Sequence, residues 1–410
     1  MDSTILHYII LGILFFQFIL ETILDYLNAK KYNDAIPEEL QDVYDDEAYK
    51  KSQEYKKTNY RFGLLTATFS LFLTIGFLLF GGFNFVDQLV SSITSNVIIQ
   101  ALLFFGIILI GSDIITTPFS YYQTFTIEEK FGFNKSTRAL FFLDKIKSWV
   151  MMAIVGGGVL SLIIWFFQWA NTNFWIYAWV LITLFTIFMN LFYSKLIVPL
   201  FNKQHPIEEG TLKNKIEAYA HKVGFALNNI YIIDGSKRST KANAYFSGFG
   251  KEKRVTLYDT LVNDLEEEEI VAVLAHEVGH YKRKHIIFNL VSSIALTGFM
   301  LFILSLFVNN PEISLAIGVL KPSFHAALIS FGILYSPISE VTGLVINSIS
   351  RKFEYQADNY AKNTYAATPL ISSLKKLSEN SLSNLTPHPA YVFMHYSHPP
   401  LIKRIRNLKE

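Results

Sequence analysis

Residues 273–285 read VLAHEVGHYKRKH, a stretch with two histidines four positions apart and a glutamate directly after the first. On an α-helix, residues i and i+4 project from one face, so His276 and His280 can bind one metal ion through neutral imidazoles. Glu277 lies beside them and can take a proton from a metal-bound water that attacks a carbonyl carbon. The pattern indicates a zinc hydrolase. The alternative is a surface helix with two incidental histidines.

A third ligand decides between these alternatives, and the sequence offers three candidates. His285 lies about half a turn from His276 on one continuous helix, so we expect a structural or interfacial role for it. Asp234 precedes the histidine pair, whereas the aspartate of site-2-type intramembrane proteases follows it. Glu354 and Asp358, in SRKFEYQADNYA, are again i and i+4, so one can bind zinc while the other holds a ligand histidine. A solvated acidic face is the alternative, and we prefer the ligand interpretation.

The histidine pair is expected on a helix over residues 264–285. Asp264 and Glu267 fit a capping box at its start. The glutamates at 266–269 and the basic residues at 282–284 suit the positive and negative ends of a helix dipole.

The rest of the polar region around this helix has a mixed pattern. Residues 211–223 are predicted to be helical because apolar residues recur at helical spacing and Gly224 follows as a stop. Strands are predicted at 229–234 and within 242–259, the second as a hairpin that turns near Gly250–Lys253. These elements predict a small α+β unit.

The whole chain is too hydrophobic for an ordinary soluble protein. It has 410 residues, of which 51% are hydrophobic and 15% aromatic, and its mean hydropathy is +0.29. Cysteine is absent, so no thiolate can bind a metal and any site must use His, Asp or Glu. Seven apolar stretches are long enough, or nearly so, to cross a bilayer, at about 5–27, 62–85, 97–115, 149–169, 174–194, 286–308 and 324–346.

Basic residues are distributed unequally between alternate connecting segments. Residues 28–61 carry seven Lys and Arg and residues 116–148 carry five, whereas 86–96 and 170–173 carry none. This asymmetry predicts an outside N-terminus and a cytoplasmic catalytic region and C-terminus. The expected location is a bacterial inner membrane or an endoplasmic-reticulum-type membrane. The expected organisation is five spans over 1–201, the catalytic α+β region over 202–285, two spans over 286–346 and a cytoplasmic C-terminal region over 347–410.

Several long motifs, in order along nearly the whole chain, resemble the type I CAAX prenyl protease family of membrane-integral zinc metalloproteases. They are YKKSQEYKKTNYRFG, FTIEEKFGFNKST, DGSKRSTKANAYFSGFGKEKRVTLYDTL, AHEVGHYKRKH, SRKFEYQADNYA and HYSHPPLIKRI. The resemblance implies a mainly α, polytopic membrane protein whose seven transmembrane helices enclose a chamber. A small α+β zinc-protease domain is implied at the cytoplasmic end of that chamber.

The resemblance also assigns roles by position. It implies one zinc ion bound by His276, His280 and Glu354, with Glu277 as general base and Asp358 as a carboxylate behind a ligand. Residues near the metal that act on the tetrahedral intermediate are implied at His398 and Arg404, and a substrate-aligning edge strand is implied at Asn243, Ala244, Tyr245 and Phe246. Taken alone, these last positions would suit capping or anchoring roles.

The predicted function is therefore a zinc endopeptidase that hydrolyses peptide bonds near the C-terminus of prenylated or membrane-associated proteins. Its expected partners are a peptide or prenylated protein and the lipid bilayer, with no nucleic acid. One alternative is a membrane quality-control protease with unprenylated substrates. Another, from a different class, is a seven-span transporter or receptor with an incidental histidine pair.

Overall fold

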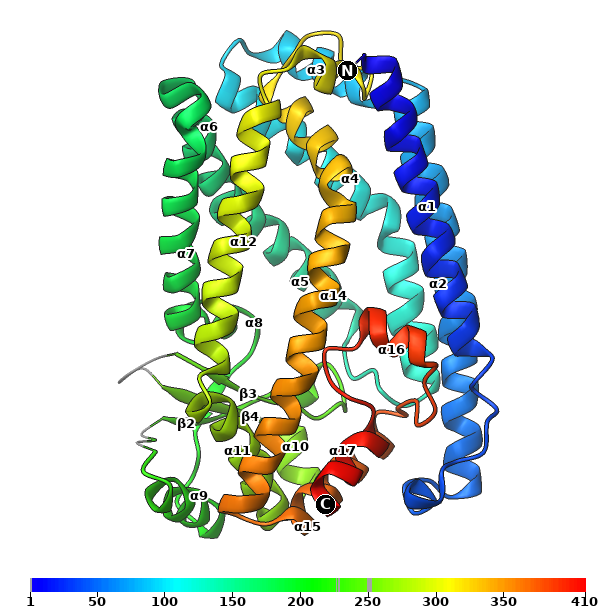
Figure 1. The fold of residues 1–410 in the computed structure, drawn as a ribbon, viewed down its shortest axis with the longest axis vertical. Coiled ribbons are helices and arrows are strands. Elements are labelled where there is room, and N and C mark those ends of the chain that lie inside the picture. The colour runs from blue at the N-terminus through cyan, green and yellow to red at the C-terminus, as the bar shows by residue number, and fades with distance from the viewer. Residues whose placement is uncertain (1, 226, 228, 249–252) are drawn as a thin grey trace.

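The computed structural model describes residues 2–225, 227, 229–248 and 253–410, and it is an elongated, mainly helical molecule (Figure 1). Long helices run along the long axis. The N-terminus lies at one end, and the C-terminus lies at the other, beside the small β-sheet and helices α9, α11 and α15.

The elements are as follows. The α-helices are α1 (Ser3–Ala29), α2 (Asp46–Leu79), α3 (Gly82–Ile93), α4 (Val97–Tyr122), α5 (Arg138–Met151), α6 (Gly157–Ala170), α7 (Phe174–Leu196), α8 (Val198–Phe201), α9 (Thr211–Lys222), α10 (Asp259–Asp264), α11 (Glu267–Lys282), α12 (His285–Phe307), α13 (Pro311–Leu315), α14 (Phe324–Thr364), α15 (Ala367–Asn380), α16 (Pro389–His395) and α17 (Leu401–Lys409). Shorter helical turns are η1 (Glu38–Leu40), η2 (Gln123–Glu128), η3 (Met152–Gly156), η4 (Asn171–Asn173) and η5 (Gly235–Lys237). The strands are β1 (Gln204–Pro206), β2 (Ile230–Ile233), β3 (Ala244–Ser247) and β4 (Arg254–Tyr258).

Within the described residues, six helical segments are long and apolar enough to cross a membrane. They are Ser3–Ala29, Asp46–Leu79, Val97–Glu128, Arg138–Phe201, His285–Phe307 and Phe324–Thr364. Each is only slightly buried within the protein, as expected of helices whose outer faces contact lipid. The chain is therefore a multi-pass membrane protein.

Two of the seven predicted apolar stretches, 149–169 and 174–194, fall within the single segment Arg138–Phe201. The chain turns between them at η4, where Asn171 has a positive φ of 49°. Helices α6 and α7 then pack against each other, with the rings of Phe166 and Tyr177 5.7 Å apart. The segment Arg138–Phe201 thus contains α6 and α7, which run side by side (Figure 1).

The sheet has the strand order β1-β2-β4-β3, so β3 is an edge strand. Strand β2 pairs with β4 in parallel, and β3 pairs with β4 antiparallel. The strands predicted at 229–234 and within 242–259 are therefore confirmed. The turn predicted near Gly250–Lys253 falls largely on 249–252, outside the described residues. Strand β1 was not predicted.

The helices beside the sheet follow the sequence with two corrections. Helix α9 ends at Lys222, one residue before the predicted end, and Gly224 has a φ of 59° just beyond Val223. The capping box of α11 is formed by Glu266 and Glu269, so the predicted pair Asp264 and Glu267 was wrong. Asp264 instead ends α10, and the extended Leu265 separates the two helices.

The second correction is that the helix predicted over 264–285 breaks near its end. Lys284 adopts a left-handed conformation with a φ of 61°, and His285 begins α12. The direction of the chain therefore changes between His280 and His285.

Helices α11 and α14 approach each other unusually closely. A Cβ atom on Gly279 would lie 3.1 Å from Ala357 Cα and 3.1 Å from Tyr360 Cβ. Glycine is needed here because the backbones of the two helices nearly touch. This contact brings the histidine pair of α11 next to the carboxylates of α14.

Candidate metal centre

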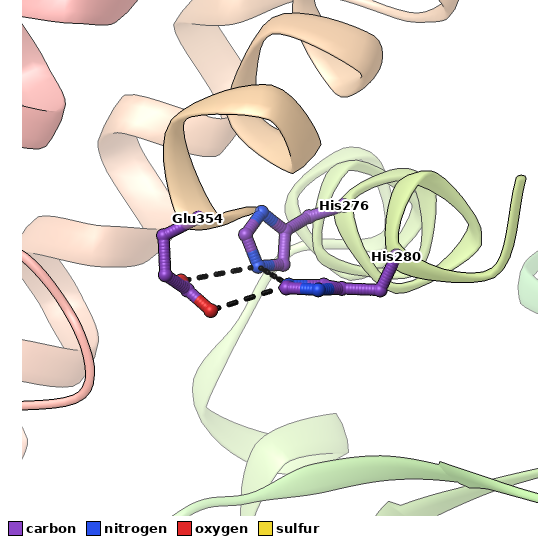
Figure 2. Close-up of side chains that lie close together, drawn as sticks. All are labelled: His276, His280 and Glu354. Carbon is purple, nitrogen blue, oxygen red and sulfur yellow. Dashed lines mark hydrogen bonds and ion pairs between the residues drawn. The ribbon is translucent and has the colours of Figure 1, made fainter. Parts of the chain in front are cut away.

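Three side chains from two helices converge on one point (Figure 2). His276 and His280 come from α11, and their Nε2 atoms are 3.1 Å apart. Glu354 comes from α14, with its Oε2 3.5 Å from His276 Nε2 and its Oε1 3.2 Å from His280 Nε2. His276 and Glu354 are buried, and His280 is partly buried.

The spacing of these atoms fits a divalent metal. Ligands bound to zinc at about 2.1 Å with tetrahedral angles lie about 3.4 Å from one another. The two Nε2 atoms are 3.1 Å apart, and each lies 3.2 or 3.5 Å from a different oxygen of Glu354. With one oxygen taken for Glu354, the three candidate ligand atoms all lie within 4.8 Å of one another. Glu354 Oε2 is also buried without a hydrogen-bond partner, which a bound cation would satisfy.

His276 is oriented from behind by a carboxylate. Its Nδ1 lies 2.9 Å from Asp358 Oδ1, so Nδ1–H donates to Asp358 and the Nε2 lone pair faces the other ligands. Burial lowers the pKa of His276, but the hydrogen bonds with Asp358 and Glu354 outweigh burial and raise it to about 9. The surrounding carboxylates therefore favour positive charge at this position.

Asp358 is itself held by a buried arginine. Arg404 Nε donates to Asp358 Oδ2 at 2.9 Å, and Arg404 Nη2 donates to Asp358 Oδ1 at 2.5 Å. Arg404 Nη1 lies 3.5 Å from Glu354 Oε2. Because α17 supplies this arginine, three helices contribute to the site.

His280 is oriented by a different chain of groups. His285 Nδ1 lies 3.1 Å from His280 Nδ1, and His285 Nε2 lies 2.9 Å from Gln356 Oε1. The amide oxygen of Gln356 accepts from His285 Nε2–H, which leaves His285 Nδ1 as an acceptor. His280 Nδ1–H then donates to His285, and the lone pair of His280 Nε2 is left for a metal.

This contact corrects the expectation that His285 lies on the opposite side of the helix from His276. That expectation assumed a continuous helix, whereas the break at Lys284 turns His285 back toward His280. The ring of His285 is held by stacking on Phe353, with centroids 4.0 Å apart and an interplanar angle of 8°. The predicted structural role of His285 is consistent with this position.

The site opens into a cavity of about 540 Å³. Glu277, His398 and Arg404 all line this cavity, together with His276 and Glu354. The imidazole of His398 is 65% exposed, and its Nε2 lies 3.3 Å from Glu354 Oε1. An exposed imidazole and the Glu277 carboxylate thus face the same space as His276 and Glu354.

Known proteins match this arrangement along the whole chain. The family described as CAAX prenyl protease N-terminal, five membrane helices, matches residues 25–203, and peptidase family M48 matches residues 206–410. The CAAX prenyl protease 1 homolog of Dictyostelium discoideum is 37% identical over 382 residues, which cover 91% of this chain and 89% of the relative. CAAX prenyl protease 1 of Saccharomyces cerevisiae is 35% identical over 428 residues, which cover 98% and 94%.

A solved structure agrees with these relatives. The crystal structure of S. mikatae Ste24p matches with a TM-score of 0.94 and 33% identity, covering 100% of both chains. The chain belongs to peptidase family M48. Its two-part match places it with the CAAX prenyl proteases, as its motifs predicted. It is therefore a membrane metallopeptidase, and the transporter or receptor alternative is excluded.

In this M48 peptidase, the competing candidate Asp234 lies away from the metal centre. Its carboxylate accepts hydrogen bonds from Asn202 Nδ2 at 2.9 Å and from the backbone N–H of Lys203 at 2.8 Å. These contacts join the chain after α8 to the end of β2. Asp234 therefore has a structural role.

The predicted edge-strand residues lie beside the metal centre of this peptidase. Asn243 and Ala244 line the same cavity as Glu277, and Tyr245 and Phe246 continue along β3. Asn243 is exposed, and its side-chain oxygen accepts from the backbone N–H of Ala244 at 2.8 Å. Among the residues that the structure describes, no strand pairs with the far edge of β3, which ends the sheet.

Sequence reasoning missed Gln356, which holds His285. Gln356 lies two residues after Glu354 on α14, within the motif that supplies the carboxylates. A glutamine at that position gave no chemical signal by itself. Only the approach of α14 to the start of α12 shows what it does.

Proposed function

We propose that this protein is a zinc endopeptidase that cleaves near the C-terminus of CAAX-type prenylated proteins. The observation that carries this proposal is the convergence of His276, His280 and Glu354, whose candidate ligand atoms all lie within 4.8 Å of one another, with the two Nε2 atoms 3.1 Å apart. The substrate class comes from its relatives, which are named CAAX prenyl proteases.

In this proposal, zinc supplies Lewis acidity, which lowers the pKa of water to about 7 and polarises the scissile carbonyl. Glu277 takes a proton from the attacking water on its carboxylate and passes it to the leaving amine. Asp358 holds His276 in the required tautomer, and Arg404 holds Asp358. The exposed imidazole of His398, whose Nε2 lies 3.3 Å from Glu354 Oε1, can donate to the developing oxyanion within the same cavity.

The substrate main chain is proposed to add to the free edge of β3. An extended peptide can pair with an edge strand through main-chain hydrogen bonds, whatever its side chains are. Asn243 lies where that edge meets the cavity of the metal centre, so its side-chain amide can donate to a substrate carbonyl. Ala244, Tyr245 and Phe246 are proposed to align the peptide.

We further propose seven membrane crossings around a chamber, with the catalytic region in the cytoplasm. The segment Arg138–Phe201 supplies two crossings, because α6 and α7 pack against each other on either side of the turn at η4. The excess of Lys and Arg in residues 28–61 and 116–148 supports the cytoplasmic side for the sheet and the metal centre.

The test of this function is a Glu277→Gln variant in purified enzyme. It is expected to keep its zinc and to lose about 10²- to 10⁴-fold in peptidase rate, because the general base is gone. Glu268→Gln, an exposed position in the first turn of the same helix, is the matched control and should cleave normally. A zinc-loaded Glu277→Gln enzyme with wild-type activity would contradict the mechanism. Peptides with and without a farnesyl group separate this function from an unprenylated quality-control role.

A further inference from the structure

A second cavity, of about 560 Å³, adjoins the metal centre along strand β3. Asn243 lines both cavities, so the two meet at the start of the strand. His276 and Glu354 line only the first cavity, and the second continues along β3 past Tyr245 and Phe246 to Ser247. We call this second space the β3 cavity.

The β3 cavity differs chemically from the cavity of the metal centre. None of its lining residues carries a charge. Its aromatic and apolar side chains come from Met189, Tyr193, Tyr245, Phe246, Tyr258 and Ile286, and Asn190, Asn243 and Ser247 add uncharged polar groups. The first cavity, by contrast, contains Glu277, Glu354 and Arg404. A charged group would lose its hydration in the β3 cavity without finding an ionic partner among these residues.

The position of the β3 cavity gives it access to the membrane region. Met189 and Tyr193 lie near the end of α7, and Ile286 lies at the start of α12. Both helices belong to segments that are apolar enough to cross a bilayer. The cavity therefore lies where the sheet edge meets two membrane helices.

We propose that the β3 cavity binds the isoprenoid chain attached to the substrate cysteine. This proposal rests on the proposed function, since it assumes a prenylated peptide paired with β3. The prenyl chain is an uncharged hydrocarbon, and its burial against aromatic and aliphatic walls is favourable. A volume of about 560 Å³ is within the range of pockets that enclose small ligands.

The two cavities also fix the direction of the peptide along β3. The residues released after the prenylated cysteine end in a carboxylate, which can accept a hydrogen bond from the exposed imidazole of His398 in the first cavity and meets no charged group in the β3 cavity. The prenylated side then lies toward Ser247. The substrate therefore runs antiparallel to β3, with its scissile bond near Asn243.

The test uses matched peptides that differ only in carrying an S-farnesyl or an S-methyl cysteine. Met189→Trp fills the β3 cavity and is expected to raise the KM of the farnesyl peptide at least about tenfold, which corresponds to about 1.4 kcal/mol. The KM of the S-methyl peptide should stay within about twofold, because that peptide places no chain in the cavity. Phe188→Trp is the matched control, since Phe188 is 45% exposed and does not line the cavity.

Met189→Ala provides the opposite change. It enlarges the cavity and should lower the KM of a geranylgeranyl peptide relative to that of the farnesyl peptide. Equal changes for the farnesyl and S-methyl peptides in both variants would overturn the assignment of the β3 cavity. Wild-type enzyme that cleaves neither peptide in a chelator-sensitive manner would instead overturn the proposed function itself.

Discussion

The chain from Gln356 through His285 to His280 offers a test of how the metal centre is held. In a His285→Phe variant, the ring stacked on Phe353 is retained, but the acceptor for His280 Nδ1–H at 3.1 Å is lost. His280 is then free to rotate and to place its proton on Nε2. A proton on Nε2 blocks metal binding at that nitrogen.

The expected loss of zinc affinity depends on which hydrogen bond behind a ligand histidine is removed: His285 holds His280, and Asp358 holds His276. Loss of a partner behind a ligand histidine costs about 10- to 100-fold in metal affinity. The bond from His280 to His285 joins neutral groups and is worth about 1 kcal/mol, so His285→Phe should fall near the tenfold end. Asp358→Asn removes a charge-assisted bond to His276, about twice as strong, and should approach 100-fold. Gln356→Leu leaves both imidazoles in place and should cost less than either.

The assay is zinc affinity, measured by competition with a chromogenic chelator, together with the visible spectrum of the cobalt-substituted enzyme. Ile287→Phe, at a position that is 49% exposed, is the control for adding a ring to α12. The expected order of loss is Asp358→Asn, then His285→Phe, then Gln356→Leu. Wild-type zinc affinity in His285→Phe, with an unchanged cobalt spectrum, would refute the orienting role of His285.

Two further predictions concern the helices that carry the site. Gly279→Ala places a methyl group 3.1 Å from Ala357 Cα, so α11 and α14 must separate. We expect the unfolding free energy to fall by about 1–3 kcal/mol and zinc to bind more weakly. Thermal unfolding with and without zinc checks both expectations. Burial raises the pKa of Glu269, but hydrogen bonds from Ser372 and Lys376 outweigh burial and lower it. Its stabilising contribution is therefore present above the ordinary carboxyl pKa of about 4.3 and is lost as the pH falls through the lower value in the folded protein. Glu269→Gln, which can keep the capping box, should unfold about 1 kcal/mol more easily at pH 7 and match wild type in strong acid, and a constant difference across pH would contradict this reasoning.

The parts of the site that rest on local spacing could be predicted from the sequence. His276 and His280 are four residues apart on α11, so they share a helical face. Glu354 and Asp358 share a face of α14 for the same reason. The membrane helices could also be predicted, because crossing a bilayer requires a long run of apolar residues. The strands β2, β3 and β4 also followed from their own composition.

The remainder depends on where the chain turns. The helix end at Lys284 could not be predicted, since a lysine in the left-handed conformation gives no signal comparable to glycine. The capping box was misplaced because four consecutive glutamates fit several registers equally well. Strand β1 has only three residues and ends at Pro206, so neither its length nor its composition indicated a strand.

The geometry of the metal centre depends on close contact between the backbones of α11 and α14. Metal ligation tolerates deviations of only about 0.2 Å, so helices joined through long flexible side chains would hold such a site poorly. Here Gly279 lets α11 lie directly against the backbone of α14 at Ala357. Ala357 lies about one helical turn after the candidate ligand Glu354. Arg404 then ties α17 to the same turn of α14 through Asp358. Because α14 runs from Phe324 to Thr364, the ligand carboxylate lies on the same helix as a membrane segment, with Pro337 as the one internal proline between the start of the helix and Glu354.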